Sequence, residues 1–181
     1  MYKFILPFVA LACIMPFTST AQQYMTREGQ VQFFSTTPIE NIEAENQQMT
    51  ALLQADGRFA FRVPVLGFRF EKALMEEHFN ENYLESHTYP NGSFEGSIVG
   101  FDATLQDGEA HDVVAKGTLT IHGVVQEREI PAKIQWNGTG WDIESIFSIA
   151  PADHDIDIPK VVRRKIAPSI EVTVRANLLP R

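Results

Sequence analysis

The chain has 181 residues and a formal net charge of −8 at pH 7. We do not expect an acidic chain to be a general nucleic-acid binder, because phosphate backbones attract positively charged surfaces. Its one cysteine, Cys13, falls in an apolar N-terminal stretch. The rest of the chain therefore has neither a disulfide nor a thiolate for catalysis or metal binding.

Residues 1–21 have the pattern of a secretory signal peptide. Lys3 is their only charge, residues 4–17 are apolar, and the "STA" that ends at Ala21 puts small residues at a cleavage position. The apolar stretch is too short for a comfortable membrane span. We therefore predict cleavage near Ala21 and export to the periplasm or out of the cell. A lipoprotein acylated on Cys13 is the weaker alternative, because the apolar residues continue beyond that cysteine.

The remaining residues, 22–181, suit one domain and are dominated by strand signals. In residues 57–70, for example, Phe59, Phe61 and Val63 recur at a period of two. Further strands are expected at 29–37, 42–54, 93–105, 111–125, 128–138, 141–151 and 169–178, with turns at Asp107–Gly108, His122–Gly123 and Asn137–Gly138. This succession predicts an antiparallel barrel or sandwich, and closure into a barrel would hide the strand edges.

One helix is expected among these strands, at about 71–85. One stripe of this helix carries Leu74, Met75, His78, Phe79, Asn82 and Tyr83, and the opposite face carries Glu76, Glu77, Asn80 and Glu81. We interpret the glutamate face as solvated and the stripe as packed inward. His78 is accordingly expected to be a buried histidine bonded to the backbone.

Two clusters of titratable residues fall short of known metal motifs. A helical zinc site would need a second histidine four residues after His78, where Asn82 stands. The three aspartates of residues 153–157 are spaced by two, but the Gly and Glu that complete a calcium loop are missing. We expect these aspartates to face water and the alternate residues His154, Ile156 and Ile158 to face inward. No metal and no cofactor is predicted.

A short basic run, "KVVRRK" at residues 160–165, follows the acidic stretch. Such a run can meet an anionic lipid headgroup or a membrane surface. More often it is a solvated turn, which the neighbouring aspartates would partly neutralise. Beyond the N-terminal stretch the sequence has no second long apolar segment, so stable membrane insertion is not expected.

Three stretches of the chain resemble the YceI-like family of exported lipid-binding proteins. In residues 76–96, a helical His is followed by Tyr83–Leu84 and by the turn "YPNGSF" at residues 89–94. In residues 117–124, "GTLTIHGV" is similar to the family's G-x-L-T-[IL]-x-G-V hairpin, and "DHDIDIPKVVRRKIAPSIEVTV" at residues 153–174 is the third stretch. Order and spacing agree across about 100 residues.

The resemblance implies an all-β, eight-stranded, antiparallel lipocalin-like barrel with the helix packed by one end. It also implies a long apolar cavity for a polyisoprenoid or another long-chain amphiphile. The residues that match the family's motifs are Phe79, Tyr83, Leu84, Tyr89, Phe94, Leu119 and Ile121. The candidate ligand-binding residues are those expected to face inward from the strands and the helix: Phe59, Phe61, Val63, Phe68, Phe70, Met75, Phe79, Tyr83, Phe94, Ile98, Leu119, Ile121, Trp136 and Phe147.

The favoured function is an exported carrier or sequestering protein for a lipid-like small molecule, without enzymatic activity. One alternative is an enzyme that uses the barrel pocket on a lipid-like substrate. Its loose titratable groups would be His78, Tyr83 and His122, although no nucleophile–base signature accompanies them. The other alternative is a ligand-free structural or interaction protein of the cell envelope, whose barrel is filled by its own Phe and Trp side chains.

Overall fold

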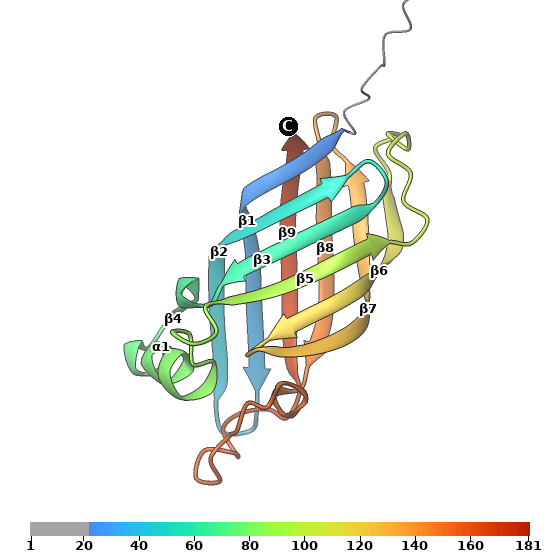
Figure 1. The fold of residues 1–181 in the computed structure, drawn as a ribbon. Helices are drawn as coiled ribbons and strands as arrows, with labels where there is room; N and C mark the ends of the chain where they lie inside the picture. Colours follow the sequence, from blue (N-terminus) through green and yellow to red (C-terminus); the bar gives the residue numbers. More distant parts are fainter. Residues whose placement is uncertain (1–21) are drawn as a thin grey trace, which may run out of the picture.

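In the computed structural model, which describes residues 22–181, eight strands close into an antiparallel barrel (Figure 1). Around the barrel the order is β1-β9-β8-β7-β6-β5-β3-β2, and β1 pairs with β2 to complete the circle. The strands are β1 (Gln23–Thr36), β2 (Asn41–Gln54), β3 (Arg58–Pro64), β5 (Asn91–Ile98), β6 (Ala110–Ile121), β7 (Val124–Trp136), β8 (Trp141–Ile149) and β9 (Ile170–Pro180). The predicted eight-stranded barrel is confirmed, and the sandwich is excluded. The predicted signal peptide and Cys13 lie outside the described residues.

Turn residues define most of the hairpins. His122 and Gly123 have φ values of 52° and 75°, so both central residues of the β6–β7 turn adopt the positive φ of a type I′ hairpin. The Asn137 side chain accepts hydrogen bonds from the backbone N–H groups of Thr139 (3.1 Å) and Gly140 (3.0 Å), which closes the β7–β8 turn. The predicted turns at these two places are confirmed.

Several strand boundaries differ from the sequence prediction; for example, the strand predicted for 57–70 ends at Pro64, where a 3₁₀ turn begins. The first strand begins at Gln23 rather than at residue 29, and the strand predicted for 93–105 ends at Ile98. After Ile98 the chain enters a loop in which Gly100 has φ 71° and the Asp102 carboxylate accepts a hydrogen bond from the Thr104 N–H at 2.9 Å. This local turn competes with the β-ladder and ends the strand.

The connections at the two ends of the barrel differ in length. At one end, which we call the mouth, lie the β1–β2 turn (37–40), the long β3–β5 connection (65–90), the β6–β7 turn and the β8–β9 connection (150–169). Figure 1 shows α1 and the β8–β9 connection beside each other at this end. The opposite end carries the other hairpin turns and both ends of the described chain.

The β3–β5 connection contains the predicted helix. It runs through a 3₁₀ turn (Val65–Gly67), the short strand β4 (Arg69–Phe70), the helix α1 (Ala73–His78) and a π-helical turn (Phe79–Tyr83). The helix predicted for about 71–85 is therefore confirmed. No helix within residues 22–181 is both long and apolar enough to cross a membrane.

The prediction that His78 is buried is wrong. None of the residues of α1 is buried, and His78 is exposed. The helix lies over the mouth of the barrel rather than against a packed core, so the residues of its inward stripe keep part of their surface accessible. The fully buried histidine is His154, in a 3₁₀ turn (Pro151–His154) of the β8–β9 connection.

The strands β5 and β6 approach each other closely at a pair of glycines. Gly96 and Gly117 lie directly opposite each other in the ladder. A Cβ atom on Gly96 would overlap the Lys116 carbonyl oxygen, and one on Gly117 would overlap the Glu95 carbonyl oxygen. Glycine at both positions is therefore a condition for this part of the barrel to close.

Gly96→Ala is expected to lower the free energy of unfolding by about 2 kcal/mol, because the new methyl group forces β5 away from β6. Gly92→Ala is the matched control on the same strand, since a Cβ there would meet only the Thr120 carbonyl oxygen, at 3.8 Å. Urea unfolding of the two variants measures the difference. Equal midpoints would contradict the role given to the Gly96–Gly117 contact.

Candidate ligand-binding cavity

The barrel encloses a cavity of about 570 Å³ that is lined almost entirely by apolar side chains. This volume lies within the usual range for small-molecule sites. Residues from all eight barrel strands, from α1 and from the β8–β9 connection contribute to the wall. Of the candidate ligand-binding residues, those that line it are Phe59, Phe61, Val63, Phe68, Phe70, Met75, Phe79, Tyr83, Phe94, Ile98, Leu119, Ile121 and Phe147.

The remaining candidate, Trp136, lies outside the cavity. Its ring packs edge-on against Tyr24 (6.1 Å between centroids) and Trp141 (5.4 Å) at the end opposite the mouth. Tyr24, Trp141 and Leu178 are fully buried there. These aromatic and aliphatic side chains form a plug that closes the barrel, so the placement of Trp136 in the cavity wall is corrected.

The polar atoms of the inner wall are mostly used by the protein itself. Ser35 Oγ accepts a hydrogen bond from the backbone N–H of Ala167 (2.9 Å), and Ser145 Oγ donates one to the Pro131 carbonyl (2.6 Å). Burial raises the pKa of the Tyr83 phenol, which keeps this side chain neutral. The interior therefore presents an apolar and uncharged surface.

Four phenylalanines pack together beneath α1. Phe79, from the π-helical turn, lies 5.0 Å from Phe70 and 5.4 Å from Phe33 and from Phe68, measured between ring centroids. Sequence reasoning missed Phe33, because it adjoins Phe34 and the apolar pair hides which ring faces inward. The alternation that begins at Val31 would have identified Phe33 as the inward one.

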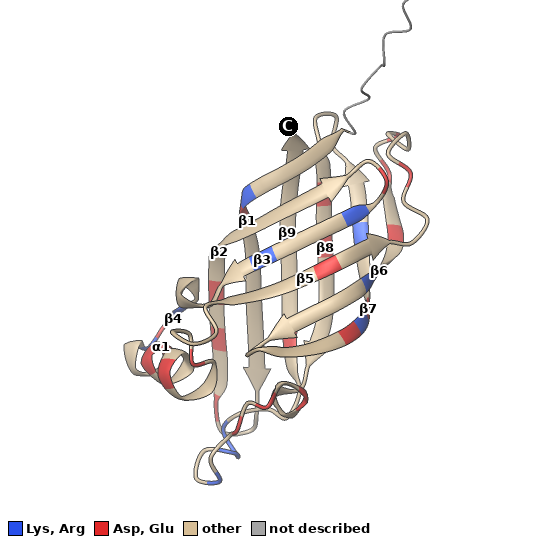
Figure 2. Ribbon diagram, in the orientation of Figure 1, with Lys and Arg blue, Asp and Glu red and all other residues tan. Residues whose placement is uncertain are grey.

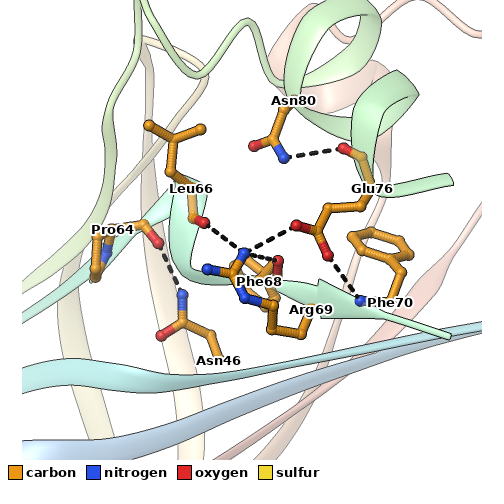
Figure 3. A network of polar contacts seen from close by, with 8 residues as sticks. All are labelled: Asn46, Pro64, Leu66, Phe68, Arg69, Phe70, Glu76 and Asn80. Atoms are coloured by element: carbon orange, nitrogen blue, oxygen red, sulfur yellow. Dashed lines mark hydrogen bonds and ion pairs between the residues drawn. The ribbon is translucent and has the colours of Figure 1, made fainter. Parts of the chain in front are cut away.

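A network of polar contacts holds α1 against β4 (Figure 3). Arg69 Nη1 donates to Glu76 Oε1 at 2.9 Å, and Glu76 Oε2 accepts from the backbone N–H of Phe70 at 3.2 Å. Asn80 Nδ2 donates to the Glu76 carbonyl at 2.9 Å. Glu76 and Asn80, predicted on the solvated face, are thus half-buried contacts, whereas Glu77 and Glu81 are exposed as predicted.

The end of β3, where this connection begins, is joined to β2 by a buried asparagine (Figure 3). Asn46 is fully buried, donates from Nδ2 to the Pro64 carbonyl (2.7 Å) and accepts at Oδ1 from the Gln48 N–H (2.8 Å). A side chain at position 67 would clash with the Asn46 amide. Gly67, whose type suggests either a bulge or a close approach, therefore permits a close approach here.

Glu40 joins three segments at the mouth. Its carboxylate lies 3.1 Å from Lys72 Nζ, just before α1, and 3.7 Å from Lys165 Nζ, in the β8–β9 connection. These ammonium groups, Lys72 foremost, hold the pKa of the Glu40 carboxyl below its usual range. All three residues line the cavity, as does the exposed His78. The mouth is therefore a polar rim around an apolar interior.

The β8–β9 connection contributes apolar residues to the cavity. Ile156 and Ile158 line it, as their alternation with the aspartates predicted, and the three aspartates are exposed. Val162 and Ile166 also line it, although no strand pattern points to them. Within residues 22–181, no three His, Cys, Asp or Glu side chains come together in an arrangement that could hold a metal ion.

The three titratable groups His78, Tyr83 and His122 are not all brought together at the cavity. His78 and Tyr83 line the cavity, but His122 does not. The His122 ring is 3.1 Å from the His154 carbonyl through Nδ1 and 2.9 Å from Glu85 Oε2 through Nε2. It thereby connects the residues after the π-helical turn with the β8–β9 connection.

A family model for the YceI-like domain matches residues 18–178. The chain belongs to the YceI-like family. No curated protein matches the chain.

Solved structures have the same fold as this YceI-like barrel. The polyisoprenoid-binding domain from Saccharophagus degradans has a TM-score of 0.76 at 14% identity, over 89% of this chain and 99% of its own. BcnA of Burkholderia cenocepacia has 0.70 at 15% identity, over 83% and 95%. The YceI protein of Campylobacter jejuni has 0.53 at 13% identity, over 98% of both chains. At these identities the likeness concerns the fold alone.

Glu76→Ala is expected to destabilise the YceI-like barrel by about 1 kcal/mol, because it removes the acceptor of both Arg69 and the Phe70 N–H. Hydrogen exchange should show faster opening of residues 66–84, while the barrel strands stay protected. Glu77→Ala is the control, since it changes the same residue type one position along α1 but on the exposed face. If the two variants exchange at equal rates, the network does not anchor the helix.

His154 should make stability depend on pH. Its side chain is fully buried, neither ring nitrogen has a hydrogen-bond partner within residues 22–181, and burial lowers the pKa of the imidazole. As the pH falls below about 6.5, the usual histidine value, the unfolded chain binds a proton that the folded one resists. Stability is therefore expected to be full above that pH and to fall on acidification towards the folded-state pKa.

His154→Leu should remove this part of the pH dependence, which urea unfolding at pH 7.5 and pH 5.5 will measure. The variant is expected to be about as stable as the parent protein at the higher pH, because leucine places an apolar side chain in the same buried position. His87→Leu, at an exposed position, is the control. An unchanged difference between the two pH values in His154→Leu would disprove the assignment.

Proposed function

We propose that this protein binds a lipid-like amphiphile, such as a polyisoprenoid, inside its barrel and acts as a carrier or sequestering protein. The observation that carries the proposal is the apolar cavity, plugged at one end and bounded by a polar rim at the other. The description of the Saccharophagus degradans domain as polyisoprenoid-binding supports the same class of ligand.

An apolar tail suits this cavity on energetic grounds. Each buried CH₂ group contributes about 0.8 kcal/mol, so a long chain can be held by many nonspecific contacts. The wall hydroxyls of Ser35 and Ser145 are already bonded, so a hydrocarbon takes the place of water there without leaving them unpaired. The polar end of the ligand would lie at the rim, near Glu40, Lys72 and Lys165.

This reading makes the protein a binding protein rather than an enzyme. Retention needs apolar contact area and shape, and neither requires a nucleophile or a general base. We also propose export of the protein after cleavage near Ala21. Outside the cytoplasm a soluble barrel would shield a tail that is poorly soluble in water.

Mass spectrometry of the purified protein, before and after organic extraction, tests the proposal. A long-chain lipid released in near-stoichiometric amount is the expected result. If the protein contains no lipid, it should still take up a polyprenol or a fatty acid added in solution. An empty protein that also rejects both added lipids would disprove lipid binding.

A pair of neighbouring residues on β8 tests whether the cavity is the binding site. Phe147 lines the cavity, whereas Ile146 is 53% exposed on the outer face. Phe147→Glu should abolish lipid uptake because a charge would be buried beside the tail, and Ile146→Glu should leave uptake unchanged. If Phe147→Glu does not fold, Ala132→Trp, which fills the cavity from β7, should lower the bound amount at least tenfold. Uptake that survives in a folded Phe147→Glu or Ala132→Trp protein would place the ligand elsewhere.

A further inference from the structure

The outermost part of the mouth is a loop of unusual composition. Residues 155–169, which we call the rim loop, project beyond the ends of the strands in Figure 1. Val161 is 89% exposed, and Lys160, Arg163 and Arg164 around it are also exposed. Figure 2 shows Lys and Arg along the outer part of this loop and Asp on the stretch that leaves β8. The tip therefore combines positive charge with an exposed apolar side chain.

The Glu40 contacts bring further apolar residues to the same rim. Ile39, next to Glu40, is 53% exposed, and Leu74, two residues after Lys72, is 60% exposed. Both lie within two residues of an ion pair that ties their segment to the rim. Among the described residues, Lys165 is the residue of the rim loop that forms an ion pair, with Glu40. Lys160 and Arg164 therefore keep their charge available to a partner.

The inner side of the rim loop belongs to the cavity. Val162, Lys165 and Ile166 line the cavity wall, together with Leu74 of α1. A surface that receives the tip of the loop would consequently meet the entrance to the cavity. Val161 points outward into solvent, whereas its neighbour Val162 lines the cavity. The outer surface of the loop and the cavity wall are therefore formed by adjacent residues.

We propose that the rim loop docks this protein on an anionic lipid surface, with Val161 entering the interface and Lys160, Arg163 and Arg164 contacting the headgroups. The charges are complementary there, although the whole chain has a net charge of −8. A soluble polyanion would satisfy the cations but leaves Val161, Leu74 and Ile39 in water, and a bilayer covers both kinds of group. Docking in this orientation faces the cavity entrance towards the membrane.

The contact is local and reversible. Each basic residue near an anionic bilayer strengthens partitioning by roughly fivefold, and the attraction decays within a Debye length. The exposed carboxylates of Glu77 on α1 and Glu81 in the π-helical turn restrict the contact to the loop side of the rim. Binding should therefore be weak, sensitive to salt and confined to vesicles that carry anionic lipid.

Co-sedimentation with vesicles of phosphatidylcholine, with and without phosphatidylglycerol, tests the proposal. The protein is purified after export, and its N-terminus is verified by mass. Binding is expected only with phosphatidylglycerol and should fall as salt rises. Lys160→Glu combined with Arg164→Glu should lower the partition coefficient at least tenfold, and Val161→Asp should also lower it.

Matched controls sit away from the rim. Lys116→Glu combined with Lys133→Glu makes the same charge change on the barrel wall, and Val99→Asp changes a 51% exposed valine at the opposite end. Neither control should alter vesicle binding. Equal losses in the controls and the rim-loop variants, or no binding to either vesicle, would overturn the proposal. So would rim-loop variants that lose binding to heparin but keep binding to vesicles.

Docking builds on the proposed function, and the two can fail separately. Lipid uptake from solution should remain intact in all rim-loop variants, because none of the substituted residues lines the cavity. Vesicle binding without lipid uptake would support the docking proposal and contradict the carrier role. Lipid uptake without vesicle binding would support the carrier role and contradict the docking proposal.

Discussion

Closure of the sheet by β1 is the constraint on which the rest of the molecule depends. β1 pairs with β2 on one side and β9 on the other, and irregularities around Gly29 bend it between these two partners. Once the circle is complete, alternate residues of every strand point into one enclosed space. The size of these inward side chains determines which part of the enclosed space is filled. Trp141 and Tyr24 fill one end, whereas Ala115, Ala132 and Ser145 leave the middle open. The cavity is thus a consequence of where small residues fall along the strands.

The segments that cover the mouth are held differently from the barrel. The strands are joined by backbone ladders, but α1 and the rim loop are fixed by a few side-chain contacts, among them Arg69–Glu76 and the Glu40 ion pairs. Lys72 and Lys165 are more than half exposed, and exposed ion pairs contribute little to stability. Opening of the mouth is therefore expected to cost far less than unfolding of the barrel, which is a requirement for exchange of a buried ligand.

Sequence periodicity predicted which face of a strand points inward. It carries no information on how far along the barrel axis an inward residue lies. Trp136 does face the interior, yet it belongs to the plug rather than to the cavity. The helical stripe was correct for Met75, Phe79 and Tyr83 as cavity residues, but burial could not be inferred for His78, because the stripe faces an opening. The polar role of Glu76 and the joining of Glu40 to Lys165 depend on contacts between distant segments. No local pattern encodes such contacts, whereas turns such as His122–Gly123 are encoded by two residues.

A barrel with one plugged end imposes a direction on its ligand. Because Tyr24, Trp141 and Leu178 are fully buried at the plugged end, the proposed amphiphile would enter with its tail first and leave with its head first. The head of this proposed ligand would stay at the rim, where Lys72 and Lys165 line the cavity, and exchange would take place at that end. The exposed Val161 and its basic neighbours occur at the same end. In a barrel open at both ends their position would be incidental, but here it coincides with the end opposite the plug, whose residues line the cavity.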